Sequence, residues 1–132
     1  MNKEDLRNEL MLKHVDVKNL VDKIKMFMKI DEYGRPFLLI REDKLTGQER
    51  LGLHLISRFF AKQMVLNDID NEWLSLKQLT ELSGIKYNIT KVRIREMEKQ
   101  RLLDKTKDGL YRVNNTGINV IADRILEKIE KR

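Results

Sequence analysis

Two helix-capping motifs and one glycine predict where the middle helices of this chain begin and end. Thr46 with Glu49, and Ser75 with Gln78, have the spacing of capping boxes, in which the two side chains satisfy amide groups at a helix start. Gly84 follows the second helix, and glycine adopts the left-handed conformation of a helix end without the penalty that a Cβ imposes. These signals predict a long, buried helix, then a short helix, then a sharp turn.

The chain after this turn changes from a helical to an extended pattern and back. Asn88 is predicted to cap a helix over residues 89–102. Asp108 and Gly109 predict the tip of a hairpin over residues 104–113, because Asp-Gly is a strong signal for a tight turn between strands. The final segment is predicted to be a helix with one apolar face. That face consists of Ile118, Ile121, Ala122, Ile125 and Ile129.

The first 48 residues carry weaker signals. The first dozen residues suit a short helix, and apolar residues recur at helical spacing from Asp16 to Met28. The segment DEYGRP, with Gly34 and Pro36, predicts a turn, and the apolar run FLLIR predicts a strand buried on both faces. One helix, one turn and one strand cannot form a core alone. We therefore expect residues 1–48 to pack on residues 49–132 or on a second copy of the chain.

The positive charge is concentrated in one stretch. The whole sequence has a formal net charge of +6. Residues 86–112 contain nine basic and four acidic residues, which gives this stretch a net charge of +5. The net charge is only +1 for residues 1–48, −1 for residues 49–85 and +1 for residues 113–132. Such a local basic patch indicates a surface for nucleic acid or for an acidic partner.

Several classes of function lack the residues that they need. The chain has no cysteine, which excludes disulfides and thiolate metal sites. His14 and His54 have no obvious ligand partners, and no carboxylate pair, Ser/His set or glycine-rich phosphate loop stands out, so we expect no enzyme, metal or cofactor. His54 is expected in the core or at an interface, and Trp73 is expected in the core. Because no signal peptide or membrane-spanning run is found, we expect a cytoplasmic protein without membrane contact.

From residue 49 onward the predicted order is helix, extended link, helix, turn, helix, hairpin, helix. This order resembles the winged helix-turn-helix superfamily of small bacterial and archaeal transcription regulators. The resemblance rests on Leu79, Leu82, Gly84, Ile85, Ile94, the segment REMEKQRLL at 95–103, the Asp-Gly tip at 108–109, Tyr111, Val113 and Gly117. The family often has an apolar residue at the position of Thr90 and a glycine at that of Arg101. The resemblance implies a mainly α domain with a small β-hairpin wing over residues 49–132, preceded by a helix-turn-strand extension over residues 1–48.

The resemblance also implies a site. Thr90, Ile94 and Met97 would point inward, so that the opposite face of helix 89–102 enters the major groove of double-stranded DNA while hairpin 104–113 follows the backbone. The residues implied to bind DNA are Tyr87, Asn88, Ile89, Lys91, Val92, Arg95, Lys99, Lys105, Lys107 and Arg112. We expect a transcription regulator without a small-molecule ligand, and a homodimer through the terminal helices because of the isoleucine face.

Other functions stay open. A winged helix can serve as a protein–protein interaction module in a larger assembly, since a fold does not dictate a function. A chromatin-like protein with little sequence preference would also need the basic patch. RNA binding is a further alternative, but aromatic residues for stacking on single-stranded bases are scarce, with only Tyr87 well placed.

Overall fold

A computed structural model of the protein describes residues 2–3, 17–64 and 71–130. The helices are α2 (Val17–Ile24), the 3-10 helix η1 (Glu42–Lys44), α3 (Gly47–Met64), α4 (Leu76–Ser83), α5 (Tyr87–Lys99) and α6 (Asn115–Glu130). The strands are β1 (Met28–Ile30), β2 (Pro36–Leu38), β3 (Leu74–Ser75), β4 (Leu103–Lys105) and β5 (Leu110–Val113). The prediction of a mainly helical fold with a small hairpin is confirmed. The helix expected in the first dozen residues falls almost entirely outside the described residues.

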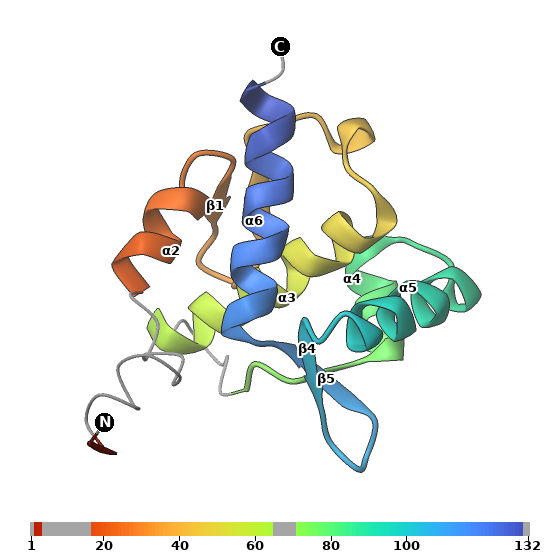
Figure 1. Cartoon of the computed structure of the whole chain (residues 1–132). Coiled ribbons are helices and arrows are strands. Elements are labelled where there is room, and N and C mark those ends of the chain that lie inside the picture. Colours follow the sequence, from red (N-terminus) through yellow and green to blue (C-terminus); the bar gives the residue numbers. More distant parts are fainter. Residues whose placement is uncertain (1, 4–16, 65–70, 131–132) are drawn as a thin grey trace.

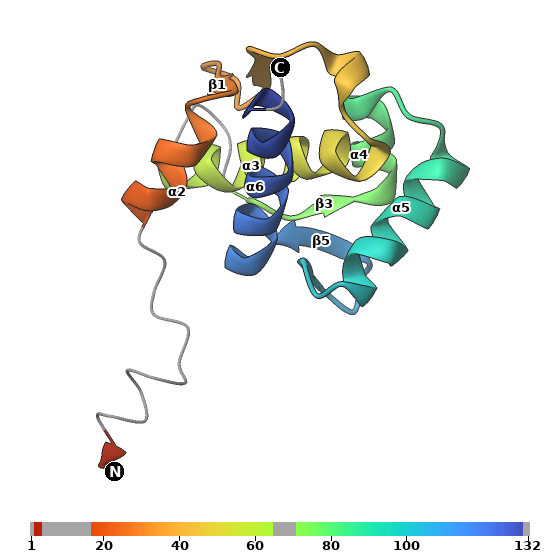
Figure 2. The same ribbon diagram turned by 45° about the horizontal axis from the view of Figure 1, so that its top comes forward.

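Helix α3 forms the centre of the core. Its capping box is present as predicted, because the Glu49 N–H donates to Thr46 Oγ1 at 3.2 Å and the Thr46 N–H donates to the Glu49 carboxylate at 3.0 Å. Burial on several sides distinguishes α3 from a surface helix, which has one apolar stripe. Its largest buried side chains are Leu51, Leu53, Leu55, Ile56 and Phe60. Figures 1 and 2 show α3 crossing the molecule between the α4–α5 end and α2.

The helix predicted from Asp16 to Met28 is wrong at its C-terminal end. Helix α2 ends at Ile24, and Met28 already begins strand β1. Phe27 and Met28 are nevertheless fully buried, with exposures of 0% and 1%. The apolar residues that suggested a longer helix therefore reach the core from a turn and a strand.

Strands β1 and β2 form an antiparallel hairpin. Its turn contains Gly34 with φ 78°, in agreement with the predicted turn. The prediction that FLLIR is buried on both faces is wrong, because Phe37 is 64% and Leu39 is 50% exposed. A two-stranded sheet that packs on the core through one face leaves alternate side chains in solvent.

Helix α4 begins with the predicted capping box. The Gln78 N–H donates to Ser75 Oγ at 3.1 Å, and the Ser75 N–H donates to the Gln78 side chain at 2.9 Å. Leu82, one of the residues on which the resemblance rests, is 37% exposed. The buried face of α4 instead joins Leu79 to Ser83, four residues later, and this rotates Leu82 outward.

The three-stranded sheet has the order β3-β5-β4 and is antiparallel throughout. Strands β4 and β5 form the predicted hairpin, with Gly109 at φ 81° in its turn. Strand β3 comes from the segment predicted only as an extended link, and it places Leu74 opposite Tyr111. Both residues are buried, so the sheet closes one side of the core.

The isoleucine face of α6 is covered within the chain. Its residues Ile118, Ile121, Ala122 and Ile125 are each 0% exposed, and Ile129 packs partly buried beside them. Helix α6 lies against α3 and α2, and Lys23 of α2 bonds Asn119 at 3.2 Å and Asp123 at 3.0 Å. The face that suggested a dimer through the terminal helices is thus explained by packing within one copy, and that dimer stays a prediction.

Residues from the N-terminal extension share one core with the rest of the chain. Leu20 and Ile24 of α2 belong to the same apolar cluster as the residues of α3 and α6. The buried Ser57 hydroxyl donates to the Gly34 carbonyl at 2.7 Å and ties the β1–β2 turn to α3. The border proposed between residues 48 and 49 falls inside the first turn of α3.

Candidate nucleic-acid interface

Helix α5 follows a tight turn whose bonds hold its first residues. Gly84, with φ 73°, ends α4 by donating its N–H to the Thr80 carbonyl at 2.9 Å. The Ile85 N–H then donates to Ser83 Oγ at 3.1 Å. Thr90 is buried and donates its hydroxyl to the Ile85 carbonyl at 3.3 Å. These bonds fix the start of α5 against the end of α4.

The inner face of α5 is as predicted, whereas its ends are not. Thr90, Ile94 and Met97 are each 0% exposed. The helix begins at Tyr87 after the N-cap Lys86, so the prediction that Asn88 caps it is wrong. No side chain forms a capping hydrogen bond at this helix start. The helix ends at Lys99 rather than at residue 102.

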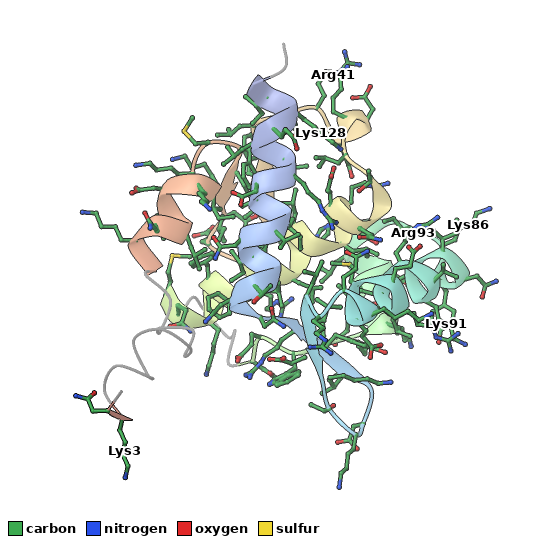
Figure 3. All side chains as sticks on the ribbon, in the orientation of Figure 1. Lys3, Arg41, Lys86, Lys91, Arg93 and Lys128 are labelled. Carbon is green, nitrogen blue, oxygen red and sulfur yellow. The ribbon has the colours of Figure 1, made fainter. Side chains whose placement is uncertain are left out.

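We call the outward side of this helix the α5 face, which consists of Tyr87, Asn88, Ile89, Lys91, Val92, Arg95 and Lys99. Lys91 is half-buried and the other members are exposed. Within the described part of the chain, Lys91, Arg95 and Lys99 form no ion pair. In Figure 3, Lys91 lies along the lower side of α5, whereas Lys86 and Arg93 lie along its upper side. The α5 face therefore presents three cations that form no ion pair, around a small apolar centre.

The upper side of α5 is anchored by a polar network. Arg93 bonds Glu96 at 2.7 Å, and Gln48 of α3 donates to the same carboxylate at 3.3 Å. Arg124 of α6 donates to Gln48 at 3.1 Å and to Gln100 at 3.0 Å. The hydrogen bond from Arg93 is the main cause that lowers the pKa of Glu96. The charge of Arg93 is thus compensated, and α5 is fixed to both α3 and α6.

Sequence reasoning missed this network. The spacing of Arg93 and Glu96, three residues apart on one helix, was a signal that the pair would form. No signal pointed to Gln48 or Arg124, which meet α5 only through the tertiary fold. The network explains which basic residues of the stretch are not free for a partner.

The β4–β5 hairpin projects from the same end of the molecule as α5 and lies below the helix in Figure 1. Lys107 is exposed in its turn. Lys105 is exposed as well, and its ammonium lies 5.6 Å from the centre of the Tyr111 ring. Both lysines thus extend the positive surface beyond the α5 face.

Arg112 does not extend that surface. Its guanidinium bonds Glu72 at 3.1 Å and Asp104 at 3.1 Å, and it stacks over the Trp73 ring at 4.4 Å from the centroid. Two carboxylates compensate its charge, so it ties β3, β4 and β5 together instead of standing free for a phosphate. Trp73, which was expected in the core, is only half-buried under this arginine.

Other predicted features lie away from this surface. His54 sits half-buried on α3, and its burial lowers its pKa below the ordinary value of 6.5. His14 is outside the described residues. Where the structure is described, no three His, Asp or Glu side chains gather as metal ligands, and no helix is long and apolar enough to cross a bilayer.

The candidate interface is therefore the α5 face together with Lys105 and Lys107 of the hairpin. Its cations are free, and those of Arg93 and Arg112 are not. When the chain is compared with protein-family models, with curated proteins and with solved structures, none of the three comparisons finds a match.

Proposed function

We propose that this protein binds double-stranded DNA through the α5 face, as a winged helix-turn-helix transcription regulator. The observation that carries the proposal is the set of free cations on one side of a rigidly held helix. Helix α5 is anchored on its inner face and its upper side, so its outer side is presented in a fixed geometry. The α5 face would lie in the major groove, with the β4–β5 hairpin beside the backbone.

The residue types of the α5 face suit DNA. Lys91 and Arg95 are four residues apart and project together from the helix. A guanidinium can donate two parallel hydrogen bonds to the O6 and N7 atoms of guanine, which assigns base reading to Arg95 and phosphate contact to Lys91. Ile89 and Val92, which are 46% and 49% exposed, could contact thymine methyl groups.

A salt titration tests this proposal. On a mixed-sequence duplex Arg95 has no fixed guanine to read and would contact phosphate instead. The five free cations, Lys91, Arg95, Lys99, Lys105 and Lys107, would then give log affinity a slope of about −4.5 against log salt, at about −0.9 per phosphate neutralised. In the Lys91→Ala/Arg95→Ala variant the slope should shrink by about 2, because two phosphate contacts are lost. The measurement is fluorescence anisotropy of a labelled mixed-sequence duplex at several salt concentrations.

The matched control removes the same charge elsewhere. Lys18 of α2 and Lys62 of α3 are exposed and lie at the end of the molecule away from α5. The Lys18→Ala/Lys62→Ala variant should keep nearly the wild-type slope. Equal losses in both double variants would mean that net charge alone drives binding, and the assignment of the α5 face would be wrong.

One observation favours a protein-interaction module as the second candidate function. Leu82, Tyr87, Ile89 and Val92 are each between 37% and 49% exposed at the α4–α5 end of the molecule. Exposed apolar side chains among cations suit an acidic protein partner as well as DNA. Weak duplex binding that is identical in wild type and in the Lys91→Ala/Arg95→Ala variant would favour this second function.

A further inference from the structure

Val92 is a side chain of α5 that points directly away from the core. It follows the buried Thr90 by two residues and precedes the buried Ile94 by two. Two residues turn a helix by about 200°, so Val92 stands opposite both of these inward side chains. It is 49% exposed, and α5 is held in place on its inner face and its upper side. An apolar side chain is therefore fixed in the middle of the α5 face.

Polar side chains that can recognise bases flank Val92 on this face. Arg95 follows Val92 by three residues and Asn88 precedes it by four, which are the spacings at which side chains are neighbours on a helix. Both flanking residues are exposed. Val92 and Arg95 are separated by about 4.5 Å along the helix axis, which is comparable to the step of about 3.4 Å between stacked base pairs. The two side chains can thus reach adjacent base pairs.

The chemistry of Val92 and Arg95 selects a pair of bases. A guanidinium donates two parallel hydrogen bonds to the O6 and N7 atoms of guanine. An apolar side chain gains most from the methyl group that thymine carries on C5 in the major groove. The base 5-methylcytosine carries the same methyl group at the same position, whereas cytosine and uracil have only a hydrogen atom there. A methyl-bearing pyrimidine next to a guanine therefore matches the two side chains together.

We propose that the α5 face recognises a 5-methylpyrimidine at the base pair next to a guanine, with Val92 against the methyl group and Arg95 on the guanine. This inference rests on the proposed DNA binding and deepens it, because it makes the methyl group on C5 a determinant of affinity. Thymine and 5-methylcytosine are both accepted at this position. The protein thereby distinguishes methylated from unmethylated cytosine beside a guanine.

The cations beside Val92 favour DNA as the occupant of this face. Arg95 and Lys99 are exposed and Lys91 is half-buried, and within the described residues none of the three forms an ion pair. A polyanion neutralises all three at once, since phosphates line both edges of the major groove. The same contacts would hold Val92 over the base edges between the phosphates.

Ile89 is a second exposed apolar side chain, but it lies farther from Arg95. It is 46% exposed and precedes Arg95 by six residues, so Val92 lies between the two on the helix surface. Six residues span about 9 Å along the axis, which exceeds two base-pair steps. Ile89 can meet a methyl group elsewhere in the site, whereas the pyrimidine next to the guanine falls to Val92.

Selection followed by substitution of one base tests the inference. The full chain is mixed with duplexes of random sequence, and the bound duplexes are recovered and sequenced. We expect an enriched site with a thymine beside a guanine. Replacing that thymine by uracil removes only the methyl group and should weaken binding about fourfold, the gain expected from burying one methyl group. With cytosine at the same position, 5-methylation should strengthen binding by a similar factor. Competition against a labelled duplex, followed by fluorescence anisotropy, measures each change.

The Val92→Ala variant assigns the effect to one side chain. Val92 is exposed and alanine favours a helix, so this variant should fold and keep its salt-dependent binding. It should lose most of the difference between thymine and uracil. The control is Val21→Ala, the same change at a 42% exposed position of α2, which should keep the difference. Circular dichroism checks that both variants are folded.

The outcomes separate this inference from the function on which it rests. Duplex binding that does not depend on Lys91 and Arg95 would overturn both. If binding depends on these two residues but uracil binds as well as thymine, only the inference is overturned. The same holds if no thymine beside a guanine is enriched, or if Val92→Ala keeps the full difference between thymine and uracil.

Discussion

Arg101 adopts a backbone conformation that an L-residue with a side chain rarely takes. Its φ is 63°, and it is the only non-glycine residue with a positive φ in the described part of the chain. The position ends α5 and turns the chain into β4, with the Arg101 carbonyl accepting a hydrogen bond from Asn114 at 3.0 Å. A glycine at this position would adopt this conformation without strain.

We expect Arg101→Gly to raise the free energy of unfolding by about 0.5–1 kcal/mol. The left-handed conformation costs an ordinary residue about 1–2 kcal/mol, and glycine gives back part of that gain through its larger entropy in the unfolded chain. Urea unfolding measures the change. The control is Arg101→Ala, which removes the same charge but keeps the Cβ. An equal gain in both variants would show that charge, not backbone strain, is responsible.

His54 should make stability depend on pH in the range just below neutrality. Burial is the main cause that lowers its pKa below 6.5. Below pH 6.5 the unfolded chain binds a proton at this residue that the folded chain does not bind, so the free energy of unfolding falls as the pH falls toward the lowered pKa. Well above pH 6.5 both states are neutral at this residue, and it adds no slope.

His54→Gln should therefore flatten the pH profile in this window, measured by urea unfolding at pH 7.5 and pH 5.5. Asp31 and Glu96 have pKa values below 3.8 and 4.5, so their titration falls outside the window. His14→Gln is the control for the other histidine. If His54→Gln keeps the full wild-type slope while His14→Gln loses it, His54 is not the titrating group.

At the scale of the elements, signals that act within a few residues predicted the structure well. The two capping boxes and Gly84 set the starts of α3 and α4 and the turn before α5, because each is satisfied by atoms close in sequence. The pattern from Asp16 to Met28 failed because periodicity marks which residues are apolar, and a turn and a strand can bury them too. The cap assigned to Asn88 was wrong because α5 already begins at Tyr87, which places Asn88 inside its first turn.

In the candidate interface, too, the features set by local helix geometry were predicted and those set by the tertiary fold were not. The inner face of α5 was what the resemblance implied, and the burial observed at i, i+4 and i+7 agrees with the geometry of a helix. The sequence pattern did not predict which cations of the interface lack an ion pair. Arg112 is compensated by Glu72, forty residues away in sequence, and α5 is anchored by Gln48 and Arg124. Such partners are chosen by the tertiary fold, and a local charge count cannot reveal them.

At the scale of the whole molecule, one shared core predicts one cooperative transition. Helix α2 and helix α6 pack on α3 in the same apolar cluster, so residues 17–48 should not unfold separately. Ile24→Ala, at a 5% exposed position, should cost about 2–4 kcal/mol as a cavity in this core. Far-UV circular dichroism and the fluorescence of the single Trp73 should shift together in urea.

Lys18→Ala is the control for this prediction, because Lys18 is exposed on the same helix. It should leave both transitions in place. Separate midpoints for the two probes in wild type, or a shift of the circular dichroism transition alone in Ile24→Ala, would mean that the N-terminal segment unfolds on its own.

The separation of compensated and free charges also bears on how fast the protein meets a partner. Residues 86–112 carry a net charge of +5 and the other segments of the chain are nearly neutral, so the positive charge is concentrated at the α5 end and the molecule has an electric dipole. Near a polyanion the resulting torque turns the α5 end forward before contact is made. Collisions then begin in a useful orientation more often than random tumbling allows, and added salt removes this advantage from the association rate.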